Sequence, residues 1–160
     1  MKWLVKLMIN VTIQIPNKKS SIMYDAVVAG GSISGLLAAR EIAKKGYSVL
    51  VLEEGFEVGS PEHCGGLVSK NALKELEIEP SQKTFDSEIE CAKIFSPEGK
   101  EITINSKRQQ IIVINRRELD KQAARQARDN GAEISVKTSF QEKIKEGVRT
   151  SNGEIKCKYF

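Results

Sequence analysis

The sequence predicts an α/β fold in which parallel strands and helices alternate. Three features between residues 24 and 53 support this fold: an apolar run, a glycine-rich turn that opens a helix of small residues, and a second apolar run that ends in an acid. This strand, helix and strand order is typical of a dinucleotide-binding unit with a Rossmann-like parallel sheet. The pattern therefore predicts a nucleotide site together with the fold class.

The first strand is expected over Tyr24–Ala29, and it must turn sharply into the helix. Side chains at such a turn have to be absent or small, because a pyrophosphate approaches the backbone there. The residues that meet this demand, and that we predict to bind the cofactor, are Gly30, Gly31, Ser32, Ser34 and Gly35. Serine replaces the middle glycine of the G-x-G-x-x-G spacing, which indicates a weakened or adapted phosphate site. A parallel unit that binds no nucleotide is the alternative interpretation.

An acid follows the second strand at the position where a ribose is bound in this type of fold. The helix is expected to end at Gly46, and the strand over Ser48–Leu52 leads to Glu53. A carboxylate here can accept hydrogen bonds from both ribose hydroxyls of an adenosine, so Glu53 and the adjacent Glu54 are candidate cofactor-binding residues. An acid also argues against a 2′-phosphate, which favours FAD or NAD over NADP.

Residues 55–69 are expected to form a loop, because they are rich in glycine and show no periodicity. Within it, the thiol of Cys64 could contact substrate or flavin, and Gly65 would let the backbone lie against a flat ring. A buried small residue in a glycine turn is the alternative for Cys64. His63, the single histidine, suggests a general acid, although a surface histidine without a partner is the alternative.

The region after residue 70 predicts a small antiparallel β layer and a second long helix. A short helix is expected over 71–76, and strands over 90–95, 101–105 and 110–114. Asn115 and Glu118 have capping-box spacing, and Gly131 is expected to end the helix that they begin. A returning strand over 132–136 and a hairpin that pairs residues 140–144 with 154–159 follow.

Composition limits the classes of function. The chain has 160 residues, of which 29% are charged and 40% hydrophobic, a balance typical of a globular protein with one core. The net charge of +4 is spread without a basic cluster, so no nucleic acid partner is expected. Three widely spaced cysteines favour a reduced, cytoplasmic setting and indicate no metal site. The apolar run within residues 1–22 is too short for a membrane span, and we expect an extension of uncertain structure before a domain over 23–160.

Two further motifs resemble the geranylgeranyl reductase family, which includes archaeal digeranylgeranylglycerophospholipid reductases and is related to p-hydroxybenzoate hydroxylase. The family has a P-x-x-C-G-x-G/A loop after the ribose-binding acid. Its positions are occupied by Pro61, Cys64, Gly65 and Leu67, and Leu67 departs from the small residue common there. The family's R-x-x-L/F-D signature falls on Arg116, Leu119 and Asp120.

This resemblance implies an FAD enzyme that reduces C=C bonds of geranylgeranyl groups by hydride transfer from the flavin. It implies that Cys64 lines the catalytic pocket, that Gly65 and Leu67 contact the cofactor, and that Arg116 approaches the cofactor from a helix start. Spacing alone favours a solvated helix terminus for Arg116 and a structural role for Asp120. The implied partners are an isoprenoid lipid, an unidentified electron donor and the inner face of a membrane, contacted peripherally.

Family members also carry a later Gly-Asp motif at the flavin, and no Gly-Asp dipeptide occurs here. We therefore expect an incomplete domain that covers the ADP half of the site, with the β-rich segment 85–114 as the start of a substrate layer. Activity of the chain alone is not expected. Two alternatives stay open: another flavin oxidoreductase or monooxygenase of the same fold, and a non-catalytic nucleotide-binding fragment.

Overall fold

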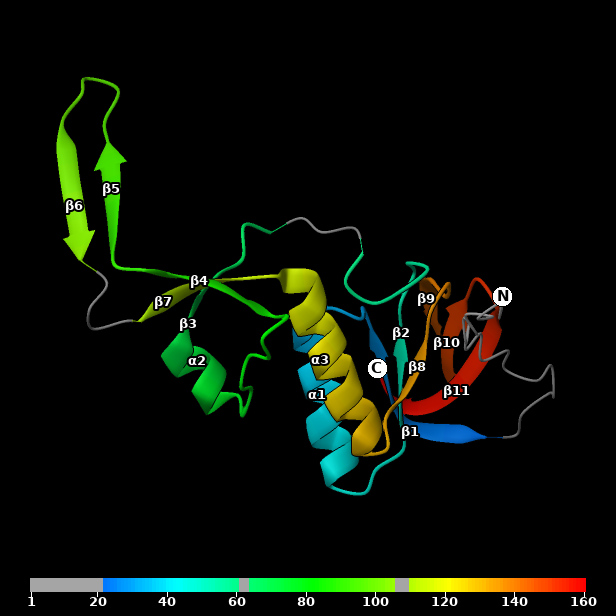
Figure 1. Ribbon diagram of the computed structural model, residues 1–160. Coiled ribbons are helices and arrows are strands. Elements are labelled where there is room, and N and C mark those ends of the chain that lie inside the picture. The colour runs from blue at the N-terminus through cyan, green and yellow to red at the C-terminus, as the bar shows by residue number, and fades with distance from the viewer. Residues whose placement is uncertain (1–21, 61–63, 106–109) are drawn as a thin grey trace, which may run out of the picture.

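The computed structural model describes residues 22–60, 64–105 and 110–160. Its largest element is a six-stranded sheet with the strand order β8-β2-β1-β11-β10-β9 (Figure 1). The parallel part of this sheet contains β1 (Met23–Ala29), β2 (Val49–Leu52), β8 (Glu133–Ser135) and β11 (Gly153–Tyr159). Two antiparallel strands, β10 (Gly147–Thr150) and β9 (Phe140–Ile144), extend it beyond β11. The predicted α/β fold with a parallel sheet is confirmed.

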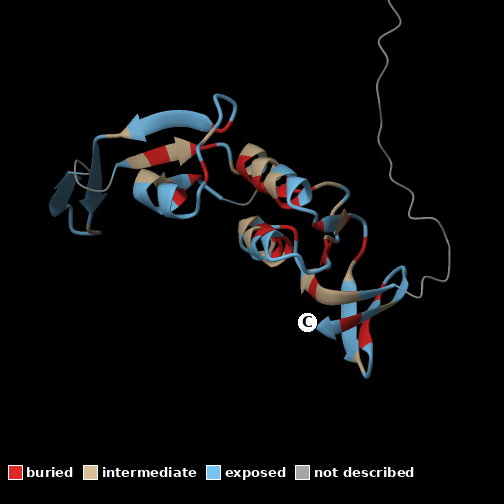
Figure 2. Ribbon diagram, turned by 90° about the horizontal axis from the view of Figure 1, so that it is seen from below, coloured by how far each residue is buried: buried red, intermediate tan, exposed pale blue. Residues whose placement is uncertain are grey.

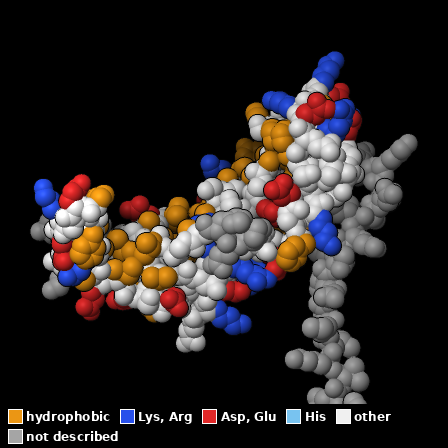
Figure 3. All heavy atoms as spheres, turned by 90° about the horizontal axis from the view of Figure 1, so that it is seen from above, with side chains coloured by type: hydrophobic (Ala, Val, Ile, Leu, Met, Phe, Trp, Pro, Cys, Tyr) orange, Lys and Arg blue, Asp and Glu red, His pale blue; other side chains and the backbone are white. Residues whose placement is uncertain are grey.

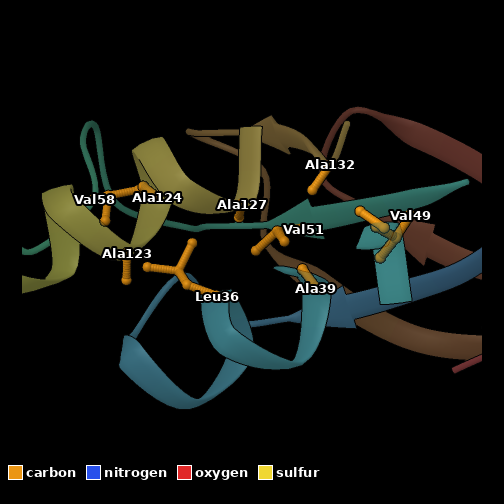
Figure 4. Packing of buried hydrophobic residues seen from close by; sticks show 10 residues of the cluster. Leu36, Ala39, Val49, Val51, Val58, Ala123, Ala124, Ala127 and Ala132 are labelled. Atoms are coloured by element: carbon orange, nitrogen blue, oxygen red, sulfur yellow. The ribbon is translucent and has the colours of Figure 1, made fainter. Parts of the chain in front are cut away.

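Two helices, α1 (Ile33–Lys44) and α3 (Arg116–Asp129), lie side by side against the parallel strands (Figure 1). Alanines at the contact, such as Ala39 and Ala123, let the helix backbones approach closely, and both are fully buried. Leu36 of α1 points toward Ala123 of α3, and Val51 of the sheet belongs to the same buried cluster (Figure 4). This core holds the turn between β1 and α1 in place.

The middle of the chain forms a separate three-stranded sheet with the order β3-β7-β4. It contains β3 (Leu67–Ser69), β7 (Ile111–Ile114) and β4 (Phe85–Ile89), and α2 (Lys70–Glu75) packs against it. Leu73 of α2 and Ile112 of β7 belong to the same buried cluster. None of the helices in the described part of the chain combines the length and the hydropathy needed to cross a membrane.

A two-stranded ribbon of β5 (Cys91–Phe95) and β6 (Glu101–Asn105) projects from this sheet (Figures 1 and 2). The pairs Ala92–Ile104 and Ile94–Ile102 place four apolar side chains on one face of the ribbon, whereas Lys93 and Thr103 lie on the other. Every residue of both strands is exposed. Hydrophobic side chains accordingly gather on the surface at this end of the molecule (Figure 3).

Three details of the strand prediction are wrong. The segment over 110–114 pairs with β3 and β4 rather than with β5 or β6, and residues 67–69 form a strand where a loop was expected. Phe140–Ile144 pairs with β10 rather than directly with Gly153–Tyr159, because β10 lies between them. The predicted turn near Ser106 and most of the extension over 1–22 lie outside the described residues.

Candidate functional site

The turn between β1 and α1 brings two stretches of backbone into close approach. Gly30 has a φ of +104°, and its N–H donates to the carbonyl oxygen of Leu52 at 2.8 Å. A Cβ atom at Gly35 would lie 2.1 Å from the carbonyl oxygen of Gly30, so a side chain cannot be placed there without moving the turn. The sequence analysis attributed the small residues to the approach of a pyrophosphate, whereas the crowding at Gly35 comes from the backbone of the turn itself.

Glu53 lies at the end of β2 and turns its carboxylate toward this corner. Its Oε2 accepts the N–H of Gly31 at 2.8 Å, and its Oε1 accepts the N–H of Gly55 at 2.7 Å. A Cβ at Gly31 would come within 2.8 Å of the same Oε2. The predicted residues Gly31 and Glu53 are therefore in direct contact, whereas the adjacent Glu54 is exposed to solvent.

The two serines of the turn leave the helix start accessible. Ser32 is the N-cap of α1, with extended dihedral angles of φ −81° and ψ 172°, and its side chain makes no capping hydrogen bond. Ser32 and Ser34 are both exposed. The N–H groups of a first helical turn have no acceptor within the helix, and they form the positive end of its dipole. Backbone donors and two hydroxyls can thus meet an anion here.

Arg116, the predicted cofactor-binding arginine, is the first residue of α3 and pairs with Asp120. Its Nη2 lies 3.3 Å from Oδ1 of Asp120, one turn further along the same helix. Asp120 also accepts a hydrogen bond from the backbone N–H of Ile33, the first residue of α1. Burial raises the pKa of Asp120, an effect opposed by the charge of Arg116 and increased by that of Glu53. The starts of α1 and α3 therefore meet around one carboxylate.

The adjacent Arg117 has a different partner. It pairs with Glu57, which also lies 3.1 Å from Lys121 of α3. The hydrogen bond from Lys121 is the main reason that the pKa of Glu57 lies below its usual value. Sequence reasoning missed Glu57, because sixty residues separate it from Arg117 and no motif joins them. This ion-pair cluster fastens the loop after Glu53 to the start of α3.

The loop that carries Cys64 lies at the end of β7. Gly66 is buried, accepts the N–H of Ile114 at 2.9 Å, and would have a Cβ only 2.1 Å from the Ile114 carbonyl oxygen. Cys64 and Gly65 are exposed, as is Leu67 at 63%. The alternative of a buried Cys64 is wrong; Cys157 is the buried cysteine, and burial raises the pKa of its thiol.

Among the hydrogen bonds of the described residues, none joins Cys64, Gly65 or Leu67 to Glu53 or to the turn at Gly30. Pro61 and His63, which the prediction also named, lie outside the described residues. The residues that the structure does bring together are the predicted turn, Glu53 and, through Asp120, Arg116. In the same described part of the chain, no three His, Cys, Asp or Glu side chains are grouped as metal ligands.

Curated relatives of this chain are digeranylgeranylglycerophospholipid reductases. The relative from Methanocella arvoryzae is 35% identical over 135 residues, which cover 82% of this chain and 33% of the relative. The relative from Picrophilus torridus is 32% identical over 137 residues, covering 83% of this chain and 34% of the relative. The chain thus spans about a third of the length of these relatives.

Solved structures show the same similarity. A geranylgeranyl bacteriochlorophyll reductase-like protein from Thermoplasma acidophilum superposes with a TM-score of 0.76 at 32% identity, covering 84% of this chain and 37% of that one. PqsL from Pseudomonas aeruginosa, a probable FAD-dependent monooxygenase, shares the fold with a TM-score of 0.64 at 14% identity, covering 85% of this chain and 41% of that one.

A family model described as FAD dependent oxidoreductase matches residues 25–158. This match includes the glycine turn, Glu53, Arg116 and most of the six-stranded sheet. It confirms FAD, the cofactor that the family resemblance implies. The resemblance to geranylgeranyl reductases is confirmed by the relatives and by the solved neighbour. The chain belongs to the FAD-dependent oxidoreductase family.

Proposed function

We propose that this chain binds the ADP half of FAD and serves an FAD-dependent reductase that acts on geranylgeranyl C=C bonds in archaeal-type isoprenoid lipids. The names of its relatives support the reaction, at 35% identity over 82% of this chain for the first of them. Because the chain spans about a third of those relatives, the activity, the lipid and the electron donor are proposed for the complete enzyme.

One observation carries the cofactor part of the proposal, namely the hydrogen bonding of Glu53. An ionised carboxylate offers about four acceptor positions. The N–H groups of Gly31 and Gly55 use two of them, at 2.8 and 2.7 Å. The other positions can accept both hydroxyls of an adenosine ribose, and the absence of a side chain at Gly31 keeps the carboxylate next to the turn.

The neighbouring groups fit a pyrophosphate. Backbone N–H groups at the start of α1 and the exposed hydroxyls of Ser32 and Ser34 are donors for its oxygens. Arg116, 25% exposed at its side chain, supplies a cation that is linked to the same helix start through Asp120. Glu53, the serines, the turn glycines and Arg116 are thus the residues that would hold the cofactor.

When bound, FAD supplies the hydride for reduction of the C=C bond. The residues of this chain would hold and orient its adenylate end, so that the reactive part is presented reproducibly to a substrate. Cys64 is predicted to line the pocket for the prenyl chain, and Gly65 and Leu67 are predicted to contact the cofactor. Cys64 and Leu67 are both exposed, so a prenyl chain can reach them.

Direct titration tests the cofactor site. The purified chain is titrated with FAD and with ADP, and quenching of flavin fluorescence and calorimetry report the dissociation constants. For Glu53→Gln we expect a loss of about 10- to 100-fold in FAD affinity, because the charge and one acceptor oxygen are lost. Glu75→Gln is the matched control, since Glu75 is an exposed acid on α2. Equal affinities of Glu53→Gln and wild type would remove Glu53 from the site.

Turnover is a separate question. The complete enzyme for which the activity is proposed is incubated with FAD, dithionite and a digeranylgeranylglycerophospholipid in vesicles. Mass spectrometry reports the expected gain of H2 at each reduced double bond. Oxygen consumption with an aromatic substrate would instead support a monooxygenase, and ADP binding without either reaction would support a nucleotide-binding fragment. Sedimentation with vesicles checks the proposed membrane contact in the same preparation.

A further inference from the structure

Asp120 is a buried residue that connects the start of α1 with the start of α3. Its side chain is 10% exposed, against 25% for its partner Arg116. In α3 the side chain of Asp120 leans back toward the start of the helix, where it meets Arg116 at 3.3 Å. It also accepts the N–H of Ile33, which lies between the two serines of the phosphate turn. The backbone N–H of Glu118 donates to Oδ1 of Asn115 at 3.0 Å, which caps the same end of α3.

We propose that Asp120 is a positioning residue for pyrophosphate recognition: it holds the guanidinium of Arg116 beside the first turn of α1, where the phosphates of the cofactor bind. This inference rests on the proposed FAD site. Asp120 itself does not touch the ligand, because its carboxylate is occupied by Arg116 and Ile33. Arg116 is the more exposed residue of the pair, at 25% against 10% for the side chain of Asp120.

The charges of Arg116, Asp120 and Glu53 explain why Arg116 needs a partner that fixes its position. A flexible arginine loses side-chain entropy when it binds a phosphate, and a second anchor at its guanidinium reduces that loss. Glu53 is close enough to influence Asp120, so two carboxylates lie near one phosphate turn. Without the anchoring bond, Arg116 is free to pair with Glu53 or solvent instead of facing the helix start.

A purely structural role for Asp120 makes a different prediction. If the carboxylate only stabilised the helix starts, its replacement would lower the free energy of unfolding and weaken all ligands alike. Burial disfavours the charged form of Asp120. Asp120→Asn, which keeps an oxygen for the N–H of Ile33, is therefore expected to leave stability at pH 7 unchanged or higher. The positioning role predicts a selective loss of affinity for ligands that contain the pyrophosphate.

The test compares ADP, which contains the pyrophosphate, with adenosine, which lacks it. Affinities are measured by NMR titration of the full chain, which reaches the millimolar range. For Asp120→Asn we expect about 5- to 20-fold weaker ADP binding and less than a 2-fold change for adenosine. Arg116→Met should show the same selectivity, and the double variant should bind ADP no more weakly than Arg116→Met alone. Asp129→Asn, at the exposed end of α3, is the matched control.

Each other outcome overturns the proposal in a recognisable way. Wild-type ADP affinity in Asp120→Asn, an equal loss for adenosine, or an effect that persists in the Arg116→Met background would each show that Asp120 does not act through Arg116. Wild-type chain that binds neither ADP nor FAD would overturn the proposed function itself, and this inference with it.

Discussion

The α1–α3 half of the molecule and the β5–β6 ribbon differ in how they use their apolar residues. Leu36 and Val51 are fully buried between helices and sheet, whereas Ile94 and Ile102 of the ribbon are 54% and 63% exposed. Burial of an apolar side chain contributes about 1.5–3 kcal/mol. The nucleotide-binding half therefore carries a core of its own, and the described part of the ribbon contributes little to stability. Four experiments test this difference, in decreasing order of the effect expected.

The largest difference is expected between two glycines. In Gly35→Ala the new Cβ would lie 2.1 Å from a backbone oxygen, so the turn has to move, at a cost of roughly 3 kcal/mol or more and with loss of FAD binding. Gly99, in the turn of the ribbon, has a φ of +80° and open space around its Cα, so Gly99→Ala should cost only about 1–2 kcal/mol. Urea unfolding measures both, and equal costs would contradict the contrast.

Truncation of two apolar side chains gives the next largest difference. Leu36 is fully buried, and Leu36→Ala should lower the free energy of unfolding by about 3 kcal/mol through lost burial and a cavity. Ile102→Ala in the ribbon should change it by less than about 0.5 kcal/mol. Thermal and urea unfolding followed by circular dichroism compare them. A large effect of Ile102→Ala would show that the apolar face of the ribbon is covered in solution.

A third pair compares two cations. Arg40 of α1 is 5% exposed and donates to Gln126 of α3 and to the carbonyl oxygen of Leu76, each at 2.9 Å. Arg40→Met leaves both acceptors without this donor and should cost about 2 kcal/mol. Lys93 pairs with Glu101 on the exposed ribbon at 2.8 Å, so Lys93→Met should cost less than about 0.5 kcal/mol. The same unfolding assays apply, and a reversed order would contradict the assignment of the core.

The smallest effect concerns acid stability of the sheet. The pKa of Asp25 is lowered to about 2, first by its hydrogen bond from Lys158 of β11 and then by Ser48. An acid with a lowered pKa stabilises the fold above its unfolded value near 4, and this contribution is lost as the pH falls toward 2. Asp25→Asn should therefore be less stable than wild type at pH 6, with the difference vanishing near pH 2. Melting temperatures across this range test it, and a constant difference would exclude the linkage.

The strand, helix and strand unit could be predicted because its signals are local. Gly30 directly follows the first strand and Gly46 comes just after the first helix, and both have a positive φ that favours glycine. Glu53 is the residue after the end of the second strand. The hydrogen bond from Gly31 to Glu53 was not predicted, because the sequence indicated only that both residues belong to the nucleotide site. The division of the chain at residue 22 and the ligand roles of these residues stay predictions.

Pairing between distant segments could not be predicted. β4 is polar along most of its length, and β10 has four residues and begins with glycine, so neither has a clear strand pattern. The place of β7 between β3 and β4 is determined by burial of Ile112 against α2, which no local signal indicates. The contact of Asp120 with Ile33 likewise depends on how α1 and α3 pack.

The double hydrogen bond of Glu53 has a consequence for the thermodynamics of ligand association. Its bonds to Gly31 and Gly55 lie within the protein, so the corner is preorganised by its own carboxylate. Ordering one loop residue costs about 1–2 kcal/mol of conformational entropy. Because the backbone at Gly31 and Gly55 is already ordered, binding of a nucleotide does not have to supply this entropy. We therefore expect little change in backbone mobility at these positions when a nucleotide binds.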